Sequence, residues 1–294
     1  MKKNHFSKRI SVLILMLTCT ILTGCSESQA KNSSSSPKPT EQSAPAAAEG
    51  QQPSVAAEAP SEPEAKGELT VAAAASLTQA FTEMGKAFEV LNHCTVTFSF
   101  NSTGTLTEQI INGAPFDVFA AANKKAVNDL ADQGFIVPET NQVFTVGRVA
   151  IAALQTSSFE AKTLEDLLNP EIKKIAIANP DLAPYGLAAK QAIEKAGLWP
   201  QLEPKLVYGK NISEALTFVS TGNAEAGFIA LSSKDEAPIH VNLIDDSMHD
   251  PLSQSMGIVK DTPNEGLAKK FTAFIMSNEG QAIMSKYGFS TPGA

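Results

Sequence analysis

The stretch Glu68-Leu-Thr-Val-Ala-Ala-Ala-Ala-Ser76-Leu-Thr decides the fold, because a short apolar strand runs directly into a small-residue turn that ends on a hydroxyl. A second stretch repeats this design, Thr95-Val-Thr-Phe-Ser-Phe-Asn-Ser-Thr103-Gly-Thr-Leu. We expect a helix to begin at each hydroxyl, where unpaired backbone N–H groups carry about half a positive charge. Neither turn contains a basic residue. The pattern therefore predicts a site for a small oxyanion that is bound by neutral donors.

Strand and helix patterns alternate along the rest of the chain, which is typical of an α/β layered fold. Apolar runs and alternation predict strands at 69–73, 96–100, 116–121, 148–154, 175–178, 226–231 and 256–260. Helical spacing predicts helices at 77–91, 106–111, 124–134, 187–196, 212–219, 265–276 and 279–287.

The N-terminus has the features of a bacterial lipoprotein signal peptide over residues 1–24. A basic start and an apolar run are followed by Leu22-Thr-Gly-Cys25, which resembles a lipobox. The alternative is an ordinary signal peptide with a chance cysteine. Residues 25–66 contain almost no large apolar side chain, so we expect a disordered linker. The chain is predicted to be exported and anchored by lipid on Cys25 at the cell envelope, on the periplasmic side or the outer face of the cytoplasmic membrane.

Composition excludes several classes of protein. The chain has 23 Lys and Arg against 31 Asp and Glu, a net charge of −8, which argues against binding to nucleic acid. Cys94 is the only cysteine after Cys25, so we expect neither an intramolecular disulfide nor a multi-cysteine metal site. No catalytic motif is present, and Ser76 has no plausible base nearby in the sequence, which argues against an enzyme. We expect no cofactor and no metal bound directly by side chains.

Several motifs in order resemble the periplasmic molybdate-binding proteins of bacterial ABC importers, which are two-lobed solute-binding proteins of type II. The motifs lie at 69–78, 98–106, 109–119, 179–186, 205–212, 226–229 and 286–289. The resemblance implies an α/β fold in which each lobe is a mostly parallel sheet flanked by helices, with the ligand cleft between the lobes. It places the first lobe at 67–147 plus 256–294 and the second at 148–255, in a monomer.

The resemblance also implies which residues bind the ligand. Ser76 and Thr103 are expected to donate from their hydroxyls, and Tyr185 and Ile212 from their backbone N–H groups. Many members carry a ligand tyrosine where this chain has Ala230. We therefore hypothesise that the phenol of Tyr185 supplies the missing hydroxyl. For Ser76 the alternative is an ordinary helix N-cap with no ligand.

Four further residues are expected to support the site without contacting the ligand directly: Asn101, Ser102, Gly104 and Asn211. Asp117 is expected to be structural, because a carboxylate that faced an oxyanion would repel it.

The function implied is capture of molybdate, and also of tungstate, for delivery to an ABC permease with its ATPase. Neutral donors favour a fully deprotonated tetrahedral anion, since a protonated ligand would place donor against donor. The alternatives are a binder of another tetrahedral oxyanion, such as sulfate or phosphate, and an oxyanion-sensing lipoprotein that is not coupled to transport.

Overall fold

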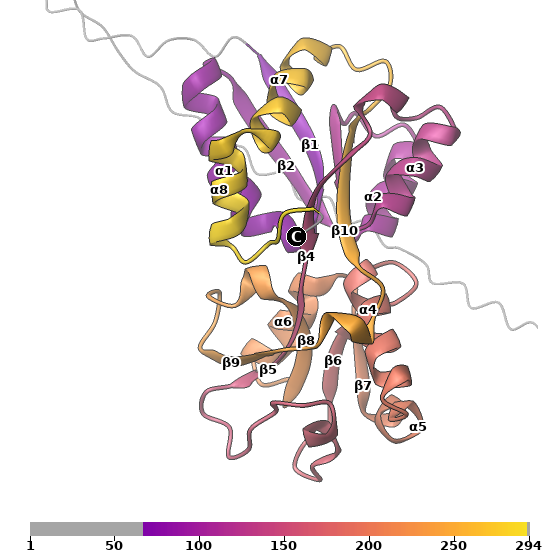
Figure 1. Ribbon diagram of the computed structural model, residues 1–294, viewed down its shortest axis with the longest axis vertical. Coiled ribbons are helices and arrows are strands. Elements are labelled where there is room, and N and C mark those ends of the chain that lie inside the picture. The colour runs from indigo at the N-terminus through magenta and orange to yellow at the C-terminus, as the bar shows by residue number, and fades with distance from the viewer. Residues whose placement is uncertain (1–66, 293–294) are drawn as a thin grey trace, which may run out of the picture. The chain divides into compact units, whose positions relative to one another are not determined.

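The computed structural model describes residues 67–292. The predicted signal peptide, the lipid attachment site Cys25 and the linker lie outside the described residues. Within the described range, no helix is both long enough and apolar enough to cross a membrane. The described residues belong to one compact unit of the chain, which contains two lobes (Figure 1).

The first lobe is built on a five-stranded sheet. Its strands are, in spatial order, β2 (Thr95–Asn101), β1 (Glu68–Ala74), β3 (Val118–Ala121), β10 (Leu252–Ile258) and β4 (Gln142–Gly147). Its helices are α1 (Thr78–Asn92), α2 (Thr103–Ile111), α3 (Lys124–Asp132), α7 (Glu265–Met276) and α8 (Asn278–Lys286). Because β10 is antiparallel to both β3 and β4 while β1 is parallel to β2 and β3, β10 is the single reversed strand.

The second lobe repeats this arrangement. Its strands are, in spatial order, β7 (Leu206–Gly209), β6 (Ile175–Ala178), β8 (Ala226–Ala230), β5 (Val149–Leu154) and β9 (Ile239–Leu243). Its helices are α4 (Pro184–Lys195), α5 (Trp199–Leu202) and α6 (Ile212–Ser220). Here β5 is the single reversed strand. The predicted α/β fold with two mostly parallel sheets is confirmed.

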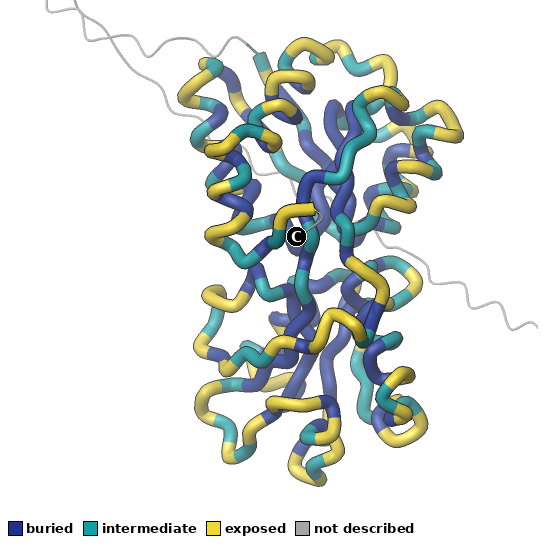
Figure 2. The backbone as a smooth tube through the Cα atoms, in the orientation of Figure 1, coloured by how far each residue is buried: buried dark blue, intermediate teal, exposed yellow. Residues whose placement is uncertain are grey.

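Helices cover both faces of the first sheet, which explains why its central strands β1 and β3 are almost entirely buried and mostly apolar. Alternate residues of β1 face opposite sides: Val71 belongs to the core shared with α1 and α7, and Ala72 to the core shared with α2 and α3. Phenylalanines fill the first core, with the rings of Phe88 and Phe271 5.1 Å apart in an edge-to-face arrangement. In Figure 2 the strands are buried at the centre of each lobe, and the exposed positions lie on the outer helices and loops.

Two segments cross between the lobes. The chain leaves the first lobe where β4 ends at Gly147, and β5 begins in the second lobe at Val149. It returns at β10, which pairs with β4 from Leu252 onward. The predicted start of this second part of the first lobe is residue 256. Strand β10 starts at Leu252, so residues 252–255 already pair in the first sheet.

Candidate functional site

The four predicted ligand residues line one cavity between the lobes: Ser76, Thr103, Tyr185 and Ile212. The cavity volume is ≈ 10 Å³, about the space that one water molecule needs. No charged side chain lines the cavity. The wall comes from the turn after β1 and from the N-terminal ends of α2, α4 and α6, so neutral hydroxyls and helix N–H groups are the available donors.

Ser76 lies in a short 3₁₀ turn, Ala75–Leu77, between β1 and α1. Its Oγ is buried and has no hydrogen-bond partner among the described residues. Helix α1 begins at Thr78, with Leu77 as its N-cap and no side-chain cap. The hydroxyl of Ser76 therefore does not cap α1, contrary to the expectation that this helix begins on it. A buried hydroxyl without a partner is costly, and its position on the cavity wall leaves it available to a ligand.

Thr103 is the first residue of α2, and the hydroxyl that caps this helix belongs to Ser102, which accepts from the N–H of Thr105 at 3.3 Å. The Oγ1 of Thr103 accepts from the N–H of Ala122 at 3.0 Å. A hydroxyl that accepts in this way keeps its own hydrogen free to donate. Thr103 is therefore oriented by β3 and its neighbour Ala122 to present a donor hydrogen.

The second lobe supplies the ends of two helices. Tyr185 is the second residue of α4, after Pro184, and Ile212 is the first residue of α6. N–H groups in the first turn of a helix have no partner within that helix. Asn211 caps α6 by accepting from the N–H of Glu214 at 3.0 Å. Pro184 suits the first helical position because its fixed φ matches the helix and its missing N–H needs no partner.

The phenol of Tyr185 lies at the crossing between the lobes. Its oxygen accepts a hydrogen bond from Nε2 of Gln254, on β10, at 3.2 Å. Burial raises the pKa of the Tyr185 phenol, and the neighbouring Ser76 hydroxyl and Gln254 amide partly oppose the rise. The phenol therefore remains a neutral group beside Ser76. Ala230, at the end of β8, is buried away from the cavity wall.

Hydrogen bonds join the lobes around the cavity. The N–H of Gly104 donates to the carbonyl of Leu182 at 2.8 Å, so it is not available to an anion. The Oγ of Ser232 donates to the carbonyl of Ser76 at 2.7 Å. Sequence reasoning missed Gln254 and Ser232, since neither belongs to a motif that points to an anion. Asn101 and Ser102, by contrast, line the cavity wall.

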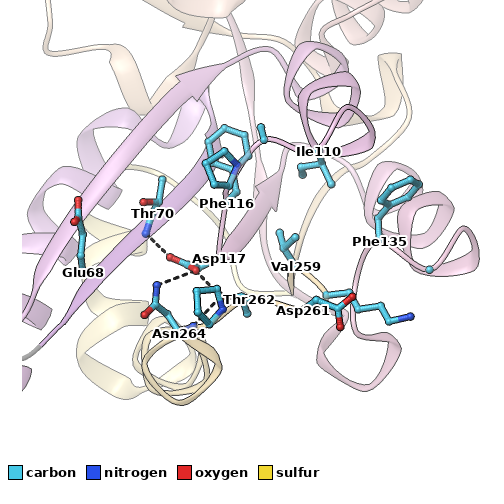
Figure 3. A pocket seen from close by; sticks show the side chains of 16 residues that line it. Glu68, Thr70, Ile110, Phe116, Asp117, Phe135, Val259, Asp261, Thr262 and Asn264 are labelled. Atoms are coloured by element: carbon cyan, nitrogen blue, oxygen red, sulfur yellow. Dashed lines mark hydrogen bonds between the residues drawn. The ribbon is translucent and has the colours of Figure 1, made fainter.

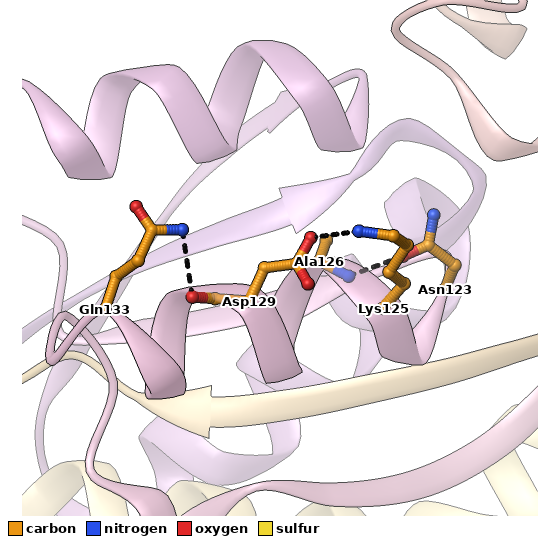
Figure 4. Close-up of polar contacts among 5 residues, drawn as sticks. All are labelled: Asn123, Lys125, Ala126, Asp129 and Gln133. Carbon is orange, nitrogen blue, oxygen red and sulfur yellow. Dashed lines mark hydrogen bonds and ion pairs between the residues drawn. The ribbon is translucent and has the colours of Figure 1, made fainter.

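The basic residue beside the site is already paired. Lys125, near the start of α3, contacts Asp129 at 2.5 Å, and Asn123 caps the same helix (Figure 4). These side chains line a neighbouring groove of ≈ 340 Å³ and not the cavity. A ligand in the cavity therefore meets no side-chain cation.

A separate cavity of ≈ 570 Å³ in the first lobe is lined by Asp117 and does not include any predicted ligand residue. Asp117 accepts from the N–H of Thr70 at 2.7 Å and from the side chains of Thr262 and Asn264 (Figure 3). This buried carboxylate ties β1 to the start of β3 and to the segment before α7. Its contacts are those of a structural residue.

The fold is that of a two-lobed protein with a small cavity between its lobes. The chain belongs to the family of bacterial extracellular solute-binding proteins, whose sequence model matches residues 69–290. Members of this family bind solutes and are not enzymes, and the family implies export from the cytoplasm. Among the described residues, no group of three or more His, Cys, Asp or Glu side chains could bind a metal ion.

Similar proteins include the molybdate-binding protein ModA of Rhodobacter capsulatus, 33% identical over 232 residues, with 78% of this chain and 90% of the relative covered. ModA of Azotobacter vinelandii is 32% identical over 227 residues, covering 76% and 89%. The solved periplasmic molybdate-binding protein of A. vinelandii has a TM-score of 0.72 at 26% identity, covering 76% of this chain and 99% of that one. The sulfate-binding protein SubI of Mycobacterium tuberculosis, at 13% identity and a TM-score of 0.66, covering 77% and 88%, shares the fold alone.

Proposed function

We propose that this protein captures molybdate, and also tungstate, outside the cytoplasm and delivers it to an ABC import permease with its ATPase. The observation that carries the proposal is the buried Oγ of Ser76, which has no partner among the described residues and lies on a wall of neutral donors. The relatives named for molybdate binding support the choice of ligand.

Four donors are proposed to contact the oxyanion. Ser76 and Thr103 would donate from their hydroxyls in the first lobe, and Tyr185 and Ile212 from backbone N–H groups in the second. The orientation of Thr103 supports this assignment, because its acceptor capacity is already used by the N–H of Ala122. Each donor lies at or beside a helix N-terminus, where the helix dipole favours an anion.

The absence of charged groups from the wall accounts for the proposed selectivity. A fully deprotonated tetrahedral anion accepts hydrogen bonds at every oxygen, whereas a protonated phosphate would leave one of its own donors facing a protein donor. The cavity of ≈ 10 Å³ has room for about one water molecule, which is less than a tetrahedral oxyanion needs and far less than a sugar or a peptide needs. An ion of five atoms must move the walls outward slightly, and the two crossings at Gly147 and Leu252 allow the lobes to do so.

Ligand binding is proposed to favour the closed arrangement of the lobes. The donors come from both lobes, so an anion satisfies all of them only when the lobes are together. This difference in affinity between open and closed forms would drive closure. The Gly104–Leu182 and Ser232–Ser76 hydrogen bonds would then stabilise the closed form around the ligand.

Membrane attachment through lipidated Cys25 is part of the proposal and rests on the lipobox resemblance alone. Cell fractionation after replacing Cys25 with Ala tests it. The parent chain should sediment with membranes, and the C25A variant should appear in the soluble or secreted fraction. If both variants partition alike, the lipid anchor is wrong.

Binding is tested by isothermal titration calorimetry of the purified full chain with molybdate, tungstate, sulfate and phosphate. We expect tight binding of the two metal oxyanions and much weaker binding of the others. If sulfate or phosphate binds tightly and the two metal oxyanions do not, the protein is instead a sulfate- or phosphate-binding protein. Transport is tested separately, by molybdate uptake in cells that lack this protein, because a sensor would bind without supporting uptake.

A further inference from the structure

Gln254 has a polar side chain in a buried position, where an apolar side chain would be more usual. It lies on β10 and is fully buried. The register between β10 and β4 shifts between Gln254 and Ser255. Such bulges are frequent beside functional sites, where they redirect a side chain. Here the side chain of Gln254 reaches Tyr185 on the opposite lobe.

Most of the hydrogen-bonding capacity of the Gln254 side chain is unused. Its Nε2 donates to Tyr185, but its Oε1 is buried without a partner among the described residues. A buried acceptor without a partner costs free energy, and an apolar side chain of the same size would avoid that cost. The single hydrogen bond that the Gln254 side chain makes, to Tyr185, therefore indicates its role.

That hydrogen bond has a fixed direction. An amide nitrogen can only donate, so the phenol oxygen of Tyr185 accepts, and the single phenol hydrogen is left for another acceptor. The hydroxyl of Ser76 is the neighbouring group, and its own Oγ has no partner in the described protein. Both residues line the cavity.

The phenol oxygen is also confined by the backbone at the crossing. A Cβ on Gly147, the last residue of β4, would lie 2.0 Å from the Tyr185 oxygen and 2.7 Å from Nε2 of Gln254. The phenol and the amide thus fill the space beside Gly147. Segments β4, β10 and α4 together determine where the phenol oxygen lies.

We propose that Gln254 is a positioning residue for the oxyanion: by donating to the phenol oxygen of Tyr185, it directs the phenol hydrogen toward Ser76 and the cavity. The single phenol hydrogen can then be donated to the Ser76 oxygen, which leaves the Ser76 hydrogen free to be donated to the ligand. This role deepens the proposed function and rests on it. Gln254 does not line the cavity. Its effect on affinity therefore acts through Tyr185.

A double-mutant cycle tests the proposal, with molybdate dissociation constants measured by calorimetry on the purified full chain. Tyr185→Phe should weaken binding about ten- to hundredfold. Gln254→Met, which removes the donor and keeps the length, should weaken it about tenfold. In the Y185F background the Gln254→Met change should have no further effect, because the hydroxyl through which it acts is gone. Gln133→Met, at an exposed glutamine of the same protein, is the matched control and should leave the dissociation constant unchanged.

The outcomes separate this proposal from the proposed function. If the parent chain binds neither molybdate nor tungstate, the function itself is wrong. If the parent binds but the effects of Q254M and Y185F are additive, or if Q254M has no effect, then Gln254 does not act through Tyr185 and only this inference is overturned. Thermal unfolding of each ligand-free variant shows whether it is folded. If Q254M does not fold, Gln254→Leu, which also removes the donor, takes its place in the cycle.

Discussion

The hydroxyl of Ser76 has no partner in the described protein, so its replacement separates binding from folding. Ser76→Ala should weaken molybdate binding about ten- to hundredfold, because an oxygen of the anion loses a donor. The stability of the ligand-free protein should stay the same or rise, because a buried unpaired hydroxyl is removed. Calorimetry and thermal unfolding of the same preparation measure the two effects. A lower melting temperature with unchanged affinity would show that Ser76 is structural.

Thr103 should behave differently, because its hydroxyl also serves the fold. Thr103→Val leaves the buried N–H of Ala122 without an acceptor, so the free energy of unfolding should fall by about 1–3 kcal/mol and binding should weaken as well. Thr103→Ser keeps the hydroxyl and should restore both properties. An equal loss in the Val and Ser variants would contradict this role, because only the Val variant lacks the hydroxyl.

At the scale of single elements, the start of α2 lies against the loop before α4. A Cβ on Gly104 would lie 3.0 Å from the carbonyl oxygen of Leu182 and 3.1 Å from its Cα, which are backbone atoms of the other lobe. Gly104→Ala should therefore disfavour the closed form and weaken molybdate binding on the order of tenfold, although the residue does not line the cavity. Gly266→Ala, in α7 with open space around it, is the control. If both variants bind alike, closure does not depend on this contact.

The connection between β1, β3 and the segment before α7 depends on Asp117. In Asp117→Asn one of the two carboxylate oxygens becomes an NH₂ group, which would face either the N–H of Thr70 or the side-chain donors of Thr262 and Asn264. The free energy of unfolding should fall by about 1–3 kcal/mol. The dissociation constant for molybdate should not change, because Asp117 lies in a different cavity from the predicted ligand residues. A large loss of affinity would contradict the structural role.

Most elements could be predicted from local sequence, and those that could not have a physical explanation. Helix α7 (Glu265–Met276) has the predicted bounds, and α4 begins at Pro184, three residues before the predicted start at 187. Strands β7 and β9 were not predicted because they are short edge strands with mixed polarity. Strand β4 was missed because β4 and β5 form one nearly continuous run from 142 to 154, and local sequence does not mark where a chain leaves one sheet and enters another.

The candidate site was predictable only in part. Ser76 and Thr103 stand at the ends of strands, where a short motif signals them. Gln254 is separated from Tyr185 by 69 residues and reaches it through a bulge in β10, and no local pattern predicts such a contact. We also predicted that α2 begins on the hydroxyl of Thr103, whereas the hydroxyl that caps this helix belongs to the preceding residue, Ser102.

In the whole molecule, one anion is expected to be bound by both lobes at once. The lobes are linked by two crossing segments and by hydrogen bonds around the cavity, among them that from Ser232 to Ser76. Ser232→Ala removes a donor that joins the lobes at Ser76, although Ser232 does not itself line the cavity. It should weaken molybdate binding by a factor of about 3 to 10, as expected for one neutral hydrogen bond. Ser220→Ala, in the same lobe, is the control, and equal affinities in the two variants would contradict a role for this contact in closure.

The most direct test of the central claim is the thermal unfolding of the purified full chain with and without molybdate. A ligand at 100 times its dissociation constant should stabilise the protein by about 2.7 kcal/mol, and the melting temperature should rise accordingly. Tungstate should give a similar rise, and sulfate and phosphate at the same concentration little or none. If neither metal oxyanion raises the melting temperature, the cavity around Ser76 and Thr103 is not an oxyanion site of this kind.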